Sequence, residues 1–96
     1  MVKIKYVYWT LKARDDINHI AEYISQDSES TARTFTENLI DSIKRLKDFP
    51  LSGRIVPEYN NTPIREIIFK KYRLIYRIKD NVVQILNVFH GSKPLD

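Results

Sequence analysis

A histidine and two arginines stand within a mostly apolar stretch of the chain, YRLIYRIKDNVVQILNVFHG at residues 72–91. They are Arg73, Arg77 and His90, and the loop before this stretch adds a carboxylate, Glu58. These residue types suit phosphodiester cleavage, which needs a base for the 2′-hydroxyl, an acid for the leaving oxygen and a cation for the charged transition state. They are equally typical of the solvated face of an antiparallel sheet. Residue types alone leave both interpretations open.

The turn inside this stretch determines which side chains share a face. A two-residue hairpin turn at residues 80–81 pairs Arg73 with Val88. Alternation along each strand then places Arg73, Arg77 and His90 together on one face of the sheet. The opposite face should pack against helices, because it is almost wholly apolar and holds Tyr72, Leu74, Tyr76, Ile78, Val83, Ile85 and Phe89.

Hydrophobic periodicity predicts the elements that must position this hairpin. Two helices, 11–25 and 29–48, carry apolar residues at helical spacing and are joined by a short turn, so they should form an antiparallel pair. The predicted strands are residues 3–8, 64–69, 72–79 and 82–89. The order β-α-α-β-β-β defines a single α+β domain, residues 1–96, with a helical hairpin packed on one face of a small, mainly antiparallel four-stranded sheet.

The positive charge of the chain lies in its second half. The net charge is +4, and residues 51–96 carry eight Lys or Arg against four Asp or Glu, whereas residues 1–50 are balanced at eight of each. This asymmetry predicts an anionic partner, either nucleic acid or an acidic protein segment.

Several classes of protein are disfavoured by the composition. The chain has no cysteine, and its two histidines, His19 and His90, are far apart in the sequence, so we expect neither disulfides nor a metal site. No phosphate-loop or dinucleotide motif is present, and we expect no cofactor. No apolar run approaches the ~20 residues of a membrane span, and the charged N-terminus does not fit a signal peptide. We therefore expect a cytoplasmic protein.

Short motifs along nearly the whole chain resemble those of the RelE/ParE toxins of bacterial type II toxin–antitoxin systems, the plasmid-stabilisation type. The pattern A-x-x-D-I-x-x-I-x-x-Y-I covers residues 13–24, and L-x-x-F-P-x-S-G-R covers residues 46–54. Shorter matches follow in the same order, at Pro57-Glu58, Arg65-Glu66, residues 72–76 and residues 88–91.

The resemblance implies a fold, a partner and two alternative activities. The family has the β-α-α-β-β-β arrangement, and its members are neutralised by a cognate antitoxin protein. RelE-like members are ribosome-dependent endoribonucleases that cleave mRNA, whereas ParE-like members inhibit DNA gyrase without a hydrolytic site. An inactive relative that only binds an antitoxin is a third alternative. The resemblance leaves open the oligomeric state with the antitoxin and whether cleavage occurs at all.

The resemblance also implies roles for individual residues. Matched to the YoeB-like ribonucleases, Glu58 would be the general base, Arg73 the phosphate clamp and His90 a general acid or orienting group, acting without metal. Gly91 follows His90 where the YoeB-like pattern has a tyrosine, and this ending is closer to ParE-like members. In the nuclease interpretation four further cations would contact RNA, an expectation from charge alone: Arg54, Arg65, Arg77 and Lys93.

Overall fold

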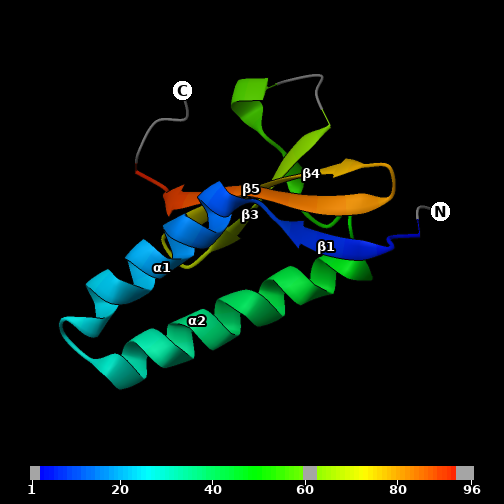
Figure 1. The fold of residues 1–96 in the computed structure, drawn as a ribbon. Coiled ribbons are helices and arrows are strands. Elements are labelled where there is room, and N and C mark those ends of the chain that lie inside the picture. Colours follow the sequence, from blue (N-terminus) through cyan, green and yellow to red (C-terminus); the bar gives the residue numbers. More distant parts are fainter. Residues whose placement is uncertain (1–2, 60–62, 93–96) are drawn as a thin grey trace.

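The computed structural model describes residues 3–59 and 63–92. Two helices lie on one side of a five-stranded sheet, and a short 3₁₀ turn lies on the other side (Figure 1). The elements in chain order are β1 (Tyr6–Trp9), α1 (Leu11–Ser25), α2 (Glu29–Lys44), η1 (Arg45–Lys47), β2 (Arg54–Ile55), η2 (Pro57–Tyr59), β3 (Ile64–Phe69), β4 (Tyr72–Lys79) and β5 (Val82–His90).

The sheet has the strand order β1-β5-β4-β3-β2. Strand β1 runs parallel to β5, and the other neighbours are antiparallel, which confirms the α+β fold with a mainly antiparallel sheet. The prediction of four strands was one short. Strand β2 has only two residues, so it carries no periodic signal in the sequence. The first strand also begins later than expected, at Tyr6 rather than residue 3.

Side-chain caps fix where both helices begin. The Thr10 hydroxyl accepts a hydrogen bond from the Ala13 N–H at the start of α1, and the Ser28 hydroxyl accepts one from the Thr31 N–H at the start of α2. Helix α2 ends at Lys44 and tightens into the 3₁₀ turn η1, so the predicted single helix 29–48 was too long.

The core lies between the helices and the sheet, as the sequence predicted. Its most buried side chains include Leu39 and Ile43 of α2, and Leu74, Tyr76 and Ile85 of the central strands. The Phe35 ring meets the edges of Phe69 and Tyr72, so aromatic packing closes the end of the core beside the β3–β4 turn.

The register of the β4–β5 hairpin corrects the predicted placement of His90. The pairs match the prediction from the turn up to Tyr76 and Ile85, but the next pair is Ile75 with Asn87, so Leu86 is an extra residue, a β-bulge. Beyond the bulge every side chain of β5 changes face.

The shift exchanges Val88, Phe89 and His90 between the two faces. Val88 is 2% exposed in the core, although it was predicted on the open face. Phe89 pairs with Arg73 on the open face, although it was predicted against the helices. His90 pairs with Tyr72 and lies on the helix-covered face, so the prediction that Arg73 and His90 share a face was wrong.

Polar groups at the start of α1 account for the bulge. The Thr10 hydroxyl lies 2.8 Å from the carbonyl oxygen of Ile85 and 3.1 Å from that of Leu86. The Asp16 carboxylate accepts a hydrogen bond of 2.9 Å from the Val88 N–H. These contacts satisfy backbone groups where the ladder is interrupted, and they join residues more than 70 positions apart, which local sequence does not indicate.

The buried hydroxyl of Tyr76 ties the loop after α2 to the sheet. It donates to the Pro50 carbonyl at 2.7 Å and accepts the Gly53 N–H at 3.0 Å. Burial raises the pKa of Tyr76. Gly53 has no room for a side chain, because a Cβ there would lie 2.6 Å from the Glu66 carbonyl oxygen and from the Tyr76 hydroxyl.

We expect Tyr76→Phe to lower the free energy of unfolding by about 1–3 kcal/mol, because it leaves a buried N–H and a buried carbonyl without their partner. Urea unfolding followed by circular dichroism measures this loss. Tyr8→Phe is the matched control, because the Tyr8 side chain is 51% exposed, and it should change stability little. Equal stability of the two variants would contradict the role given to the Tyr76 hydroxyl.

Candidate functional site

A cluster of four charged side chains lies on the face of the sheet that the helices leave uncovered. The Arg73 Nε donates to the Glu66 Oε1 at 2.6 Å, and its two terminal nitrogens donate to both Glu58 oxygens at 2.9 and 3.0 Å. Arg54 donates to the second oxygen of Glu66. The strands β2, β3 and β4 supply Arg54, Glu66 and Arg73, and the turn η2 supplies Glu58.

Glu66 is the centre of this cluster, and the sequence did not predict its role. The residue is 1% exposed and Arg73 is 9% exposed, so both charges are removed from water. Two arginines compensate the single buried carboxylate. The available signal was a charged residue in a strand whose other residues are largely apolar, because such a charge requires a partner when it is buried.

The contacts hold Glu58 and Arg73 in their charged forms. The hydrogen bonds from Arg73, helped by a backbone hydrogen bond, lower the pKa of Glu58 from 4.5 to about 2. The same hydrogen bonds raise the pKa of Arg73, against the opposing effect of burial. A carboxylate with so low a pKa is a weak proton acceptor near neutral pH. The positive charge of Arg73 is compensated by two carboxylates, so its attraction for a phosphate is reduced.

His90 lies on the other side of the sheet from this cluster. Its ring packs edge-on against Tyr72 with centroids 5.6 Å apart, and its Nδ1 lies 2.7 Å from the Ser92 hydroxyl. It lines a hollow with His19 and Ile20 of α1. The structure thus brings Glu58 and Arg73 together but leaves His90 apart, and the catalytic roles of all three stay predictions.

The predicted RNA-contacting cations also separate. Arg54 is paired with Glu66, whereas Arg65 donates to the Gly53 carbonyl at 2.7 Å and Arg77 donates to the Gln84 side chain at 2.6 Å. Within residues 3–59 and 63–92, neither Arg65 nor Arg77 contacts a carboxylate. Lys93 lies outside the described residues.

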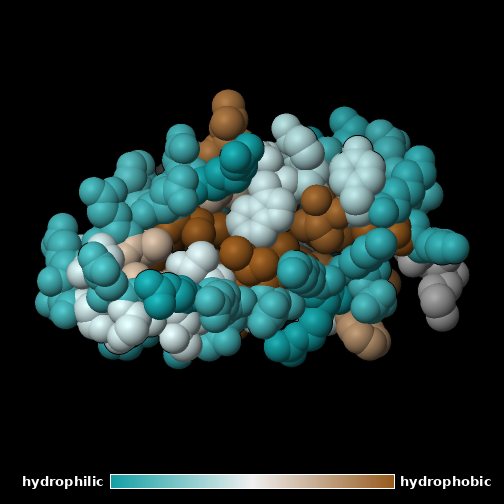
Figure 2. Space-filling view, turned by 60° about the horizontal axis from the view of Figure 1, so that its bottom comes forward, coloured by the Kyte–Doolittle hydropathy of each residue, from teal (hydrophilic) through white to brown (hydrophobic). Residues whose placement is uncertain are grey.

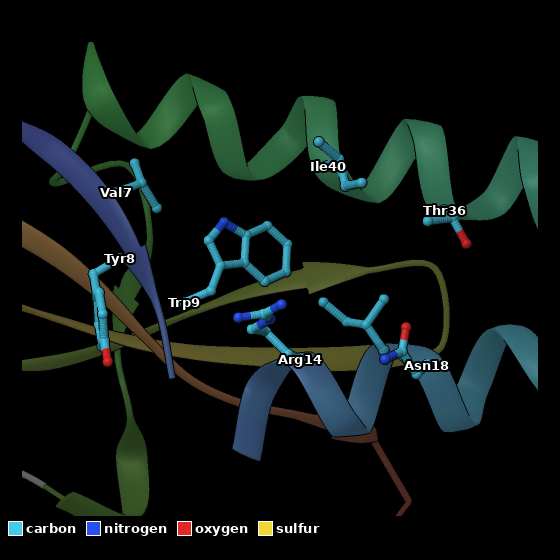
Figure 3. Close-up of a pocket in the computed structure, with 8 residues that line it drawn as sticks. Val7, Tyr8, Trp9, Arg14, Asn18, Thr36 and Ile40 are labelled. Atoms are coloured by element: carbon cyan, nitrogen blue, oxygen red, sulfur yellow. The ribbon is translucent and has the colours of Figure 1, made fainter. Parts of the chain in front are cut away.

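A second candidate site is a hollow of about 510 Å³ between β1 and the two helices. Figure 3 shows the Trp9 indole between the helices, with Arg14 on one side and Ile40 on the other. On the helical side of the molecule, hydrophobic side chains lie along a depression between more hydrophilic ridges (Figure 2). Trp9 packs against the core but remains partly exposed.

The hollow continues between the helices. Thr36 lines both it and a neighbouring depression that reaches Ala21 of α1 and Ala32 of α2. Two arginines, Arg14 and Arg33, line the combined groove, and so do two glutamates, Glu22 and Glu37. Its apolar floor and charged margin are features of a surface that binds an amphipathic helix.

No three His, Asp or Glu side chains within residues 3–59 and 63–92 lie together in a way that would hold a metal ion. Neither described helix is both long and apolar enough to cross a membrane.

Comparison with known proteins shows the class to which this chain belongs, the RelE/ParE superfamily of small toxins. The family model described as ParE toxin of type II toxin–antitoxin system, parDE, matches residues 7–95. The chain therefore belongs to the ParE toxin family.

Individual relatives bear both family names. The chain is 27% identical over 88 residues to Toxin RelE2 of Caulobacter vibrioides, covering 91% of this chain and 96% of that protein. A chain of the chromosomal ParDE system of P. aeruginosa superposes with a TM-score of 0.76 at 19% identity, covering 94% and 98% of the two chains. A chain of the RelBE2 toxin–antitoxin complex of Mycobacterium tuberculosis has a TM-score of 0.64 at 25% identity, covering 88% and 95%.

We expect the Glu58–Arg73 ion pair to persist far below neutral pH. Because the folded pKa of Glu58 is below its unfolded value of 4.5, the pair contributes its full stability above about pH 4.5 and loses it as the pH falls towards 2. NMR titration of the side-chain carboxyl carbon should give a midpoint near 2 for Glu58.

Glu58→Gln is the matched variant for the accompanying stability measurement. Its deficit in the free energy of unfolding relative to the natural chain should be constant above about pH 4.5 and should shrink at lower pH. A Glu58 midpoint near 4.5, with a deficit that does not depend on pH, would contradict the ion pair.

Proposed function

We propose that this toxin acts by binding a protein target, DNA gyrase, and that a cognate antitoxin neutralises it. The observation that carries the proposal is the separation of His90 from Arg73 and Glu58 by the sheet. A general acid and a phosphate clamp must reach the same phosphodiester at the same time. Side chains on opposite faces of one sheet do not meet that requirement.

The state of the charged cluster supports the same choice. Glu58 has its pKa lowered to about 2 by Arg73, whereas an efficient base at neutral pH needs a pKa close to 7. Arg73 is held by Glu66 as well as Glu58, so its contacts are those of a buried structural charge. The match to the ParE family model and the Gly91 that follows His90 agree with a toxin that performs no chemistry itself.

Ribosome-dependent cleavage of mRNA is the second candidate. It is favoured by the contact between Glu58 and Arg73, and by the 27% identity to Toxin RelE2. RNA would have to displace Glu58 from Arg73, and His90 would have to act from the far face or after the β5 bulge rearranges. These requirements place cleavage second.

The antitoxin is proposed to bind the groove between β1, α1 and α2. The groove offers Trp9 and Ile40 for apolar contact, and Arg14 beside them for an acidic side chain. The relatives in the ParDE and RelBE2 structures belong to toxin–antitoxin systems, which supports an antitoxin as partner. An amphipathic helix would cover the hydrophobic side chains visible in Figure 2.

Parallel assays of supercoiling and translation distinguish the two activities. We expect the purified toxin to inhibit supercoiling by gyrase and to leave an mRNA intact on translating ribosomes, as judged by primer extension. His90→Ala separates the mechanisms further, because a binding toxin keeps its ability to arrest growth and a nuclease loses it. Ribosome-dependent cuts that vanish in His90→Ala would overturn the proposal. A folded chain that is harmless in cells would indicate the inactive alternative.

Fluorescence of Trp9, the single tryptophan of the chain, reports on the antitoxin groove. We expect titration with the cognate antitoxin to shift its emission, because the helix would cover the partly exposed indole. Ile40→Asp should weaken binding at least about ten-fold, the size of a loss at an interface hot spot. Leu11→Ser is the control, because Leu11 is 75% exposed and does not line the groove. Unchanged binding by Ile40→Asp would contradict this location.

A further inference from the structure

A second exposed apolar area lies away from the antitoxin groove. Phe49, Leu51, Ile55 and Ile68 are 64, 58, 46 and 54% exposed, and they are half of the eight exposed large hydrophobic residues in the described chain. They lie in the loop after α2 and on the neighbouring strands β2 and β3. Phe49 and Ile68 line one hollow, and we call these two residues the Phe49 surface. Ile55 pairs with Arg65, so its side chain lies on the other face of the sheet from Ile68. None of these four residues lines the groove at Trp9.

The Phe49 surface includes a hollow of about 660 Å³. Phe49 and Ile68 form part of its wall together with Arg45 and with Arg54, which is paired with Glu66 of the same wall. The segment 44–54 carries four basic residues and one acidic residue, so the apolar side chains are surrounded by positive charge. An apolar area bordered by charge on a small protein is typical of a protein-binding site.

The edge of the sheet at the Phe49 surface is also open. Strand β2 pairs only with Arg65 and Glu66, and the Val56 N–H extends this ladder to the Ile64 carbonyl. In an antiparallel strand, the N–H and C=O groups that face one neighbouring strand recur at every second residue. On the edge of β3 that faces β2, the groups that follow those of Glu66 therefore belong to Ile68. In the described chain no strand pairs with β3 at Ile68 on that side. An extended segment can therefore add its backbone there.

We propose that the Phe49 surface binds an extended segment of the target protein that carries apolar and acidic side chains. An apolar side chain enters the hollow between Phe49 and Ile68, acidic neighbours meet Arg45, and the backbone pairs with Ile68. This inference rests on the proposed function, because it assigns the surface to the target and the helical groove to the antitoxin.

Charge and residue type select this occupant over the others. Two copies of the chain would bring two positive segments 44–54 together, which repels. Nucleic acid is disfavoured, because Phe49 is the one aromatic side chain among the described residues that line the hollow, and the aliphatic Ile68 offers no ring for a second base. An acidic and apolar segment complements both the charge and the exposed side chains.

The variants Phe49→Ser, Ile68→Ser and Arg45→Glu test the surface, with Leu11→Ser as the control for loss of an exposed apolar side chain. All are compared with the natural chain for inhibition of gyrase supercoiling, growth arrest, antitoxin binding by Trp9 fluorescence, and size by exclusion chromatography. We expect the concentration for half-inhibition to rise at least about ten-fold in the three variants. Antitoxin binding should be unchanged, which also shows that the variants are folded.

Each alternative has its own outcome. Inhibition equal to that of the natural chain overturns the inference, and so does a loss of antitoxin binding by folded variants or a dimer that only the natural chain forms. If the natural chain leaves gyrase untouched, the proposed function fails separately. Growth arrest then decides the surface: arrest lost in the three variants supports it as the site for another protein target, and arrest unchanged overturns it.

Discussion

The contacts between the start of α1 and strand β5 determine on which face of the sheet the predicted site residues lie. Thr10 reaches the carbonyls of Ile85 and Leu86, and Asp16 accepts the N–H of Val88. Together they accommodate one extra residue in β5, which reverses the face of every side chain that follows. Val88 is thereby buried and His90 is directed towards the helices. One bulge therefore separates His90 from Arg73, although the sequence predicted both on one face.

The buried charges on the other face have a mainly structural role in this arrangement. Glu66 is almost fully enclosed, and its two arginines come from strands on either side of β3. Removing one partner of such a cluster leaves an uncompensated buried charge, which is strongly destabilising. Arg73 therefore joins β4 to β3 and to the turn η2, and its affinity for Glu58 keeps both groups charged at all ordinary pH values.

The chain presents two separate exposed apolar surfaces, one proposed for the antitoxin and one proposed for the target. The groove beside Trp9 lies between β1 and the helices, and the Phe49 surface lies at the other edge of the sheet. Both combine apolar side chains with arginine. If the two surfaces are separate, the antitoxin can bind the toxin without first displacing the target from the Phe49 surface.

The sequence by itself determined the elements, because periodic burial marks both helices and the three long strands within a few residues. It also determined the hairpin turn, the apolar core and Arg73 on the open face. The tertiary structure alone decided three things: the two-residue strand β2, the pairing of Arg73 with Glu58 and Glu66, and the face of His90. Each depends on residues distant in sequence, and the bulge depends on side chains of α1 about 70 residues away. Local periodicity carries no information about such contacts, because they form only when the helix packs against the sheet.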